Sequence, residues 1–186
     1  MFVRLAVRCF SSLPPSVSGS YFQIFSLEPS FKIDLVELSR LYKRLQAEHH
    51  PDKHVKGSAE KQESAAKESA MLNEAYKCLR HPYTRARHLL RVREHDPNVR
   101  TMDMEFLSDM MEFNDEIEMC EDLHRLDQIR DLNEKAIALL FKQFNDLFNE
   151  GELKTAAECL AKCKFLMQTR ERIEQQREFF KGGLAK

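Results

Sequence analysis

The stretch from Asn98 to Glu150 contains neither glycine nor proline, and its apolar residues recur every three or four positions. Glycine and proline are the residues that most readily interrupt a helix, so their absence over this length favours long, regular helices. The whole chain of 186 residues holds only 5 glycines and 6 prolines, which argues against a loop-rich or all-β fold. The sequence therefore predicts an all-α protein.

Three further features of the composition exclude broad classes of function. The longest central apolar run, Ala136 to Phe141, is far short of the ~20 residues that span a bilayer, so we expect no membrane insertion. A net charge of −1 argues against a general nucleic-acid binder. The 5 cysteines are odd in number and form no CxxC pair, which fits neither a disulfide framework nor a four-cysteine zinc site. Cys159 and Cys163, one helical turn apart, offer either two metal ligands or two small apolar residues. We expect no metal or other cofactor.

The N-terminal segment has the composition of a targeting signal. Its first acidic residue is Glu28, it carries Arg4 and Arg8, and it is rich in serine up to Ser26. A segment that is rich in arginine and serine and poor in acids is typical of a mitochondrial transit peptide. The sequence predicts a transit peptide and linker over residues 1–19 and a location in the mitochondrial matrix. The alternative is a tail without a function.

The next segment has the pattern of a helical hairpin. A short helix is expected over Tyr21–Leu27, a longer one over Asp34–His49 with Asp34 as its N-cap, and another over Ala59–Leu79. The longer helices carry apolar stripes that would pack them antiparallel: Leu35, Leu38, Leu41, Tyr42 and Leu45 on one, and Ala65, Leu72, Ala75, Tyr76 and Leu79 on the other. The helix over Asp34–His49 carries Arg40, Lys43 and Arg44 on the face opposite to its apolar stripe. Pro51 ends this helix and leaves an exposed loop at the tip of the hairpin.

This pattern resembles a J domain. The resemblance rests on the loop His49-His50-Pro51-Asp52-Lys53 together with its flanks: Tyr21-Phe22-Gln23-Ile24-Phe25, Tyr42-Lys43-Arg44-Leu45 and Leu72-Asn73-Glu74-Ala75-Tyr76. J domains dock on the ATPase module of a DnaK-class heat-shock chaperone and stimulate ATP hydrolysis. The resemblance implies that His50, Pro51, Asp52 and Lys53 form the triggering loop, with Arg40, Lys43 and Arg44 as electrostatic docking residues. A metal site of His49, His50 and His54 is the rival interpretation, although Pro51 interrupts the helical spacing it would need.

The second half of the chain predicts a bundle of three antiparallel helices. The expected helices are Met102–Glu121, Asp127–Asn149, for which Gly151 suits the C-terminal cap, and a third that begins near Glu152. In the second helix the predicted core stripe is Ile129, Leu132, Ala136, Leu140 and Leu147. Residues 103–122 hold nine acidic residues and no basic one. Phe165 lies on the side of the third helix opposite to that helix's own apolar stripe, which is an unusual place for an aromatic residue.

The stretch Leu79-Arg80-His81-Pro82 to Leu89-Leu90 makes the chain similar to the HscB type of co-chaperone. In that family the bundle binds the scaffold protein on which iron–sulfur clusters are assembled. The resemblance implies a J domain over residues 20–95 and a scaffold-binding bundle over 100–180. It assigns the scaffold contacts to Leu107, Met111, Glu112, Asp115 and Phe165. The alternative is that these apolar residues belong to the core of the bundle.

The resemblance implies a mitochondrial co-chaperone that is not itself an enzyme. It would bind the iron–sulfur scaffold protein, deliver it to a mitochondrial DnaK-class chaperone and stimulate that chaperone's ATPase, which promotes cluster transfer. We expect a monomer that binds neither nucleic acid nor membranes. Two alternatives remain open. One is a J-domain co-chaperone with an unrelated client, and the other is a small metal-dependent enzyme that uses the histidines.

Overall fold

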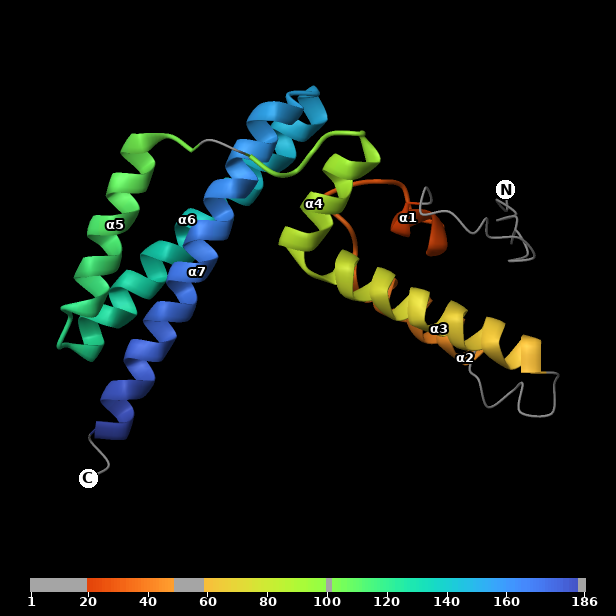
Figure 1. Ribbon diagram of the computed structural model, residues 1–186, viewed down its shortest axis with the longest axis horizontal. Coiled ribbons are helices and arrows are strands. Elements are labelled where there is room, and N and C mark those ends of the chain that lie inside the picture. The colour runs from red at the N-terminus through yellow and green to blue at the C-terminus, as the bar shows by residue number, and fades with distance from the viewer. Residues whose placement is uncertain (1–19, 49–58, 100–101, 184–186) are drawn as a thin grey trace.

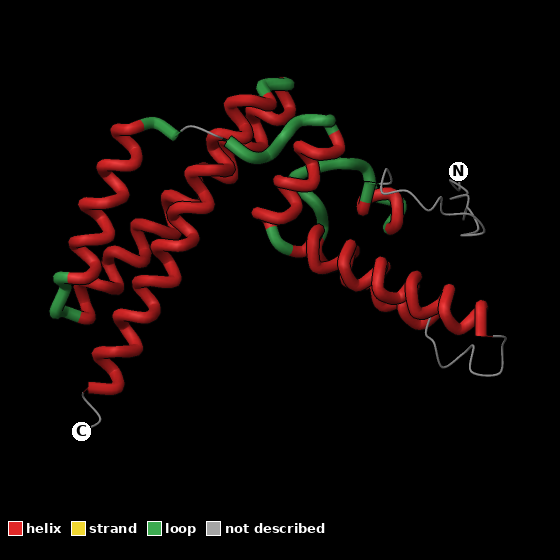
Figure 2. The backbone as a smooth tube through the Cα atoms, in the orientation of Figure 1, coloured by secondary structure: helices red, strands yellow, loops and turns green. Residues whose placement is uncertain are grey.

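The computed structural model describes residues 20–48, 59–99 and 102–183, and every regular element in these ranges is a helix (Figures 1 and 2). Helices α1 to α4 form an N-terminal unit, and α5 to α7 form the bundle. None of the described helices is both long and apolar enough to cross a bilayer. In chain order the helices are α1 (Tyr21–Ile24), α2 (Leu35–Glu48), α3 (Ala59–Arg80), α4 (Pro82–Val92), α5 (Met104–Glu118), α6 (Leu123–Glu150) and α7 (Leu153–Gly183).

Helix α2 begins at the predicted cap. Asp34 Oδ1 accepts the backbone N–H groups of Val36 at 2.8 Å and Glu37 at 3.2 Å, two donors that the first turn of a helix leaves unpaired. The stripe of Leu38, Leu41 and Leu45 is buried as predicted. Leu35 is the exception, with 47% of its surface exposed. The Tyr76 hydroxyl contacts Ser39 Oγ at 3.5 Å, and Tyr76 lies about one turn before the end of α3. Leu35 lies one turn before Ser39 on α2, and it is therefore at the edge of the contact between the two helices.

A series of polar contacts sets the register of α2 against α3. Asn73 Oδ1 accepts hydrogen bonds from the Tyr42 hydroxyl at 2.6 Å and from Gln46 Nε2 at 2.7 Å. Ser69 Oγ donates to Gln46 Oε1 at 3.2 Å, and the rings of Tyr42 and Tyr76 stack with centroids 4.1 Å apart. Such contacts have a defined geometry, unlike the burial of leucine, and they therefore fix how far one helix slides along the other.

Helix α1 is shorter than predicted. The sequence pattern extends to Leu27, but the helix ends at Ile24 because Ser26 adopts a left-handed φ of 54°. This turn allows the Leu27 N–H to donate to the Phe22 carbonyl at 2.9 Å, which closes the C-terminus in the manner of a Schellman motif. The chain then leaves α1 and runs towards α2.

Helices α3 and α4 are joined by a sharp turn at His81. Pro82 occupies the first turn of α4, where its missing N–H and fixed φ suit a helix start. The Arg85 guanidinium is buried and donates from Nη1 to the Leu79 carbonyl at 2.5 Å, which satisfies an acceptor at the end of α3. Leu89 and Leu90 on the following turn are fully buried.

Helices α6 and α7 form a long antiparallel hairpin. Asp122 caps α6, about one turn before the predicted start at Asp127, by accepting the His124 N–H at 2.9 Å. Gly151 ends α6 as predicted, because its φ of 85° is the left-handed conformation that glycine adopts without strain. Helix α5 packs against α7 and runs parallel to it, since Phe106 meets Phe165 near one end and Glu118 meets Arg172 near the other.

The core stripe of α6 differs from the predicted one. Ile129 is buried, but Leu132 is 55% exposed, and the buried positions are Leu126, Ile129, Asn133, Ile137, Phe144, Asn145 and Phe148. Asn133 explains the error, because it is a polar residue at the centre of the true stripe. Its side chain is buried and donates from Nδ2 to the Leu166 carbonyl at 3.0 Å. A stripe defined by apolar residues alone omits Asn133 and therefore falls on a different side of α6 from the stripe that is buried.

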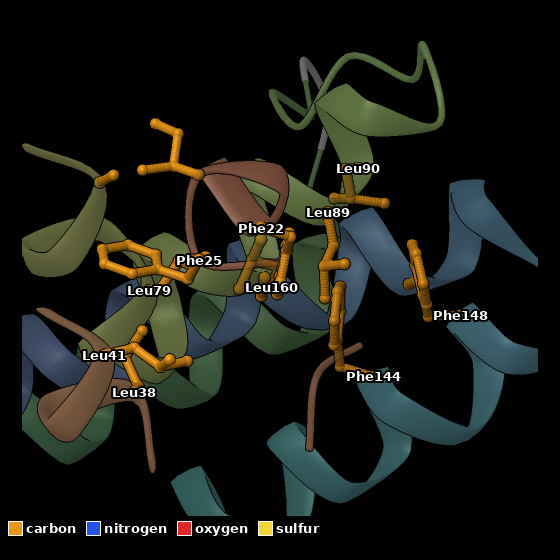
Figure 3. Close-up of a cluster of buried hydrophobic side chains, with 14 of the residues drawn as sticks. Phe22, Phe25, Leu38, Leu41, Leu79, Leu89, Leu90, Phe144, Phe148 and Leu160 are labelled. Atoms are coloured by element: carbon orange, nitrogen blue, oxygen red, sulfur yellow. The ribbon is translucent and has the colours of Figure 1, made fainter. Parts of the chain in front are cut away.

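One hydrophobic core joins the N-terminal unit to the bundle (Figure 3). Phe31 marks the junction, since it lies 5.1 Å from the Arg85 guanidinium and 5.2 Å from the ring of Phe144 on α6. A second cluster, formed by Ile117, Leu126, Ile129 and Ile173, holds the far end of the bundle. The joint core contains Phe22, Phe25, Leu38, Leu41, Leu79, Leu89 and Leu90 from α1 to α4, and Phe144, Phe148, Ala156 and Leu160 from α6 and α7.

Candidate functional site

The first candidate surface is the basic face of α2. Because the leucine stripe is buried, Arg40, Lys43 and Arg44 are exposed on the other side of the helix. Arg40 forms a bidentate ion pair with Glu37, at 2.6 and 2.7 Å, which raises the pKa of Arg40 and lowers that of Glu37. Lys43 and Arg44 form no ion pair with any described residue, so they supply most of the free positive charge on this face.

The predicted triggering loop, with His50, Pro51, Asp52 and Lys53, lies outside the described residues, as do His49 and His54 of the rival metal site. The described residues on either side show where the loop is attached. It connects the end of α2 to the start of α3. Gln46, in the last turn of α2, accepts a hydrogen bond from Ser69, which lies almost three turns after the start of α3.

The second candidate surface lies on α5. Met111 is 69% exposed and Leu107 is half-buried, while Glu112 and Asp115 are exposed. Of the nine acidic residues between 103 and 122, only Glu116 and Glu118 form ion pairs within the described chain, with Arg125 and Arg172. Helix α5 therefore presents apolar side chains beside several carboxylates that no basic residue of the described chain neutralises.

Phe165 joins this surface from α7. Its ring packs edge-to-face on Phe106 of α5, with centroids 6.0 Å apart, and Lys162 Nζ lies 5.1 Å from the Phe106 ring centre. Phe165 is half-buried. The unusual position of Phe165 has a simple cause: α7 packs against both α6 and α5, so it carries two apolar sides. The structure thus places Phe165 against Phe106, the residue that precedes Leu107 on α5.

An open groove of about 410 Å³ lies beside Phe165, between α5 and α7. It is lined by Asn114, Phe165, Gln168, Thr169, Glu171, Arg172 and Gln175. Apart from Phe165, none of these residues was expected from the sequence to contribute to a site. A signal did exist, because residues 168, 172 and 175 follow Phe165 at helical spacing and so share its side of α7.

The described cysteines, Cys78, Cys120, Cys159 and Cys163, are free thiols. No cluster of three or more His, Cys, Asp or Glu residues suited to a metal occurs among the described residues. Cys163 is buried between α7 and its neighbours, and this burial raises the pKa of its thiol to about 12. Cys163 therefore stays a neutral thiol and behaves as a small core residue.

Comparisons with known proteins agree with this architecture. Residues 102–174 match a family model described as the HSCB C-terminal oligomerisation domain. A co-chaperone protein HscB homolog from Neisseria meningitidis serogroup A is 34% identical over 165 residues, which cover 83% of this chain and 97% of that protein. The crystal structure of human co-chaperone protein HscB superposes with a TM-score of 0.82 and 26% identity, covering 88% of this chain and 84% of the human one. Chaperone HscB from Vibrio cholerae gives a TM-score of 0.78 and 25% identity, with 86% and 98% covered.

The chain belongs to the HscB co-chaperone family. The predicted resemblance is therefore confirmed at the level of the family. The predicted fold class is confirmed as well: α1 to α4 form the J domain, and α5 to α7 form the helical C-terminal domain. The assignments of individual residues to a chaperone or a scaffold, and the domain boundaries, stay predictions.

Proposed function

We propose that this protein binds the iron–sulfur cluster scaffold protein through α5 and α7, delivers it to a mitochondrial DnaK-class chaperone, and stimulates that chaperone's ATPase through the His50-Pro51-Asp52 loop. Its own role is then to bring two partners together and not to catalyse a reaction. Membership of the HscB co-chaperone family supports this role. The finer assignments rest on the two surfaces described above.

The observation that carries the proposal is that Met111 is exposed and Leu107 half-buried on α5, where Glu112 and Asp115 are also exposed, while Phe165 of α7 packs on the neighbouring Phe106. Apolar side chains left exposed next to unpaired carboxylates suit a partner that offers an apolar patch with basic residues around it. A residue that served only the core would be fully buried, and Met111 is 69% exposed. The exposure of Met111 favours a binding role over the core alternative for this residue. For Phe165, which is half-buried, the preference is weaker.

The distance between the two surfaces supports delivery by tethering. The basic face of α2 belongs to the J domain, whereas α5 lies on the other side of the junction between the J domain and the bundle (Figure 1). A scaffold bound to α5 and a chaperone bound to α2 therefore do not compete for the same surface. Holding both on one chain raises their effective concentration for each other, which favours transfer without any new contact.

The proposed location is the mitochondrial matrix, with residues 1–19 as the transit peptide. The composition of this segment, with Arg4 and Arg8 before the first acidic residue, supports the proposal. Import of the full chain into isolated mitochondria, followed by mass determination of the imported form, tests it. A cleaved, protease-protected product is expected. An uncleaved product that stays accessible to added protease would contradict both the location and the transit peptide.

The test of function is single-turnover ATP hydrolysis by a mitochondrial DnaK-class chaperone, with this protein added in the presence or absence of the scaffold protein. Stimulation by this protein, increased further by the scaffold, is expected. Stimulation without any effect of the scaffold would support a J-domain co-chaperone with another client. No stimulation at all would contradict the proposal.

The His50→Gln variant is the control for the triggering loop. We expect it to lose ATPase stimulation while its affinity for the scaffold stays that of the wild type, because the loop and α5 belong to different surfaces. A Lys135→Gln change on the exposed face of α6 removes a charge away from both surfaces and should leave stimulation and scaffold binding unaltered. Full stimulation by His50→Gln would refute the role of the loop.

A further inference from the structure

The groove between α5 and α7 is open to solvent and has a largely polar lining. Phe165, whose ring packs edge-to-face on Phe106, belongs to this lining, and so does Arg172, which pairs with Glu118 at 3.4 Å. Apart from Phe165, every lining side chain carries hydrogen-bonding groups. The volume of the groove, about 410 Å³, lies within the range of roughly 300–1,000 Å³ that is usual for ligand sites.

The carboxamides of the groove have unused hydrogen-bonding capacity. Gln168 and Gln175 are exposed and form no hydrogen bond within the described chain. Asn114 uses only its Oδ1, as an acceptor 3.4 Å from the Thr169 hydroxyl, and its amide N–H groups have no partner in the described chain. Thr169 also lies 3.2 Å from the Phe165 carbonyl, so its single proton serves one of the two acceptors at a time.

The chemistry of these groups matches a polypeptide main chain. A carboxamide offers both a donor and an acceptor, and an extended main chain presents N–H and C=O groups in the same alternation. Glu171 and Arg172 are the charged residues of the lining, and Arg172 already pairs with Glu118 at 3.4 Å. The remaining polar groups are amides and a hydroxyl, which suit a ligand with hydrogen-bonding groups better than a strongly acidic one.

The groove is continuous with the proposed scaffold-binding surface, because Phe165 belongs to both. We propose that it is a second part of that surface, in which Asn114, Gln168 and Gln175 hold an extended main-chain segment of the scaffold protein. This inference rests on the proposed function. The apolar and acidic residues of α5 bind scaffold side chains, and the groove binds the scaffold backbone next to them.

The Gln168→Leu/Gln175→Leu double variant tests the proposal, because it removes both amides while keeping side chains of similar size. Loss of two hydrogen bonds predicts scaffold binding that is roughly tenfold to thirtyfold weaker by isothermal titration calorimetry. The matched control is Gln143→Leu on the exposed face of α6, which should bind the scaffold like the wild type. Circular dichroism should show unchanged helix content in both variants.

Hydrogen exchange of the scaffold gives the readout that is specific to main-chain recognition. Binding of the wild-type protein should protect the amides of one contiguous scaffold segment, and the double variant should lose this protection. Wild-type affinity in the double variant, together with loss of binding in Phe165→Ala, would overturn the role of the groove and leave the proposed function intact. Absence of scaffold binding by the wild-type protein would overturn both.

Discussion

Met111 and Phe165 are assigned to the same binding surface, yet their surroundings differ. Met111 is 69% exposed and packs little against its own protein, whereas Phe165 is half-buried and its ring packs on Phe106. Truncation of Phe165 therefore removes an internal contact as well as any contact with a partner. Met111 is the better residue with which to separate binding from folding.

We expect Met111→Ala to weaken scaffold binding by about 1–2 kcal/mol and to change the free energy of unfolding by less than about 0.5 kcal/mol, as is usual for exposed positions. Calorimetric titration and urea unfolding measure the two quantities. Leu132→Ala on α6 is the matched control, because it truncates a similarly exposed apolar residue outside the surface. If Met111→Ala and Leu132→Ala bind the scaffold equally well, Met111 is not part of the site.

His88 holds the start of α1 against α4. Its Nε2 accepts the Tyr21 backbone N–H at 2.9 Å, and its ring stacks on that of Tyr21 with centroids 4.4 Å apart. Since Nε2 is the acceptor, the neutral ring carries its proton on Nδ1, and protonation of Nε2 breaks the contact. Burial, with a smaller contribution from the nearby Arg91, lowers the pKa of His88 below its usual 6.5.

This lowered pKa predicts a pH dependence of stability. As the pH falls below 6.5, the unfolded chain takes up a proton on His88 before the folded protein does, so the free energy of unfolding decreases. Above pH 6.5 both states are neutral at this position and the full stability is retained. Urea unfolding at a series of pH values should show a weaker dependence in His88→Gln than in the wild type between pH 6.5 and 5. His124→Gln, at an exposed histidine, should keep the wild-type slope, and equal slopes in all three proteins would contradict the prediction.

At the scale of elements, the hairpin of α2 and α3 depends on polar as well as apolar contacts. The leucine and alanine stripes predict that the helices pack, but such stripes tolerate sliding by a turn. Asn73 accepts two hydrogen bonds from α2, from Tyr42 and Gln46, and thereby selects one register. Under the proposed function the register matters, because these two helices carry the ends of the predicted triggering loop.

Asn73→Ala should lower the free energy of unfolding by about 1–3 kcal/mol, since it removes two partly buried hydrogen bonds. Urea unfolding measures this loss. Asn149→Ala in the last turn of α6 is the matched control, because Asn149 is exposed, and a change within about 0.5 kcal/mol is expected there. An equally small effect of Asn73→Ala would mean that the apolar stripes alone hold the hairpin.

At the scale of the whole molecule, the J domain and the bundle share one core. Phe144 of α6 is fully buried and contacts Phe31 of the J domain, and Arg93 after α4 lies 5.5 Å from the ring of Phe148. Such a shared apolar interface couples the folding of the two units and fixes one relative orientation. The two proposed partner surfaces are thereby held at a defined distance from each other.

Phe144→Ala should destabilise the protein by about 3–5 kcal/mol and lower the hydrogen-exchange protection of amides in both α4 and α6. Ile129→Ala belongs to the separate cluster at the far end of the bundle. Its loss of protection should stay within α5, α6 and α7. Unchanged protection of α4 in Phe144→Ala would show that the two units do not depend on a common core.

The sequence by itself determined the local features of this protein. Helix caps at Asp34 and Gly151, the leucine stripe of α2, and the helical class all follow from interactions between residues within about one turn of each other. The same holds for the family resemblance, which rests on short motifs with their flanks. These features are decided by backbone geometry and by the spacing of apolar residues, both of which can be read along the chain.

Only the tertiary structure decided which side of each helix is buried when a helix has more than one neighbour. Asn133 occupies the core because a carbonyl of α7 accepts its amide, and Phe165 faces α5 because α7 packs against two helices. The joint core between the J domain and the bundle, and the groove beside Phe165, likewise arise from residues far apart in sequence. Their burial depends on distances between helices, and a one-dimensional pattern does not contain those distances.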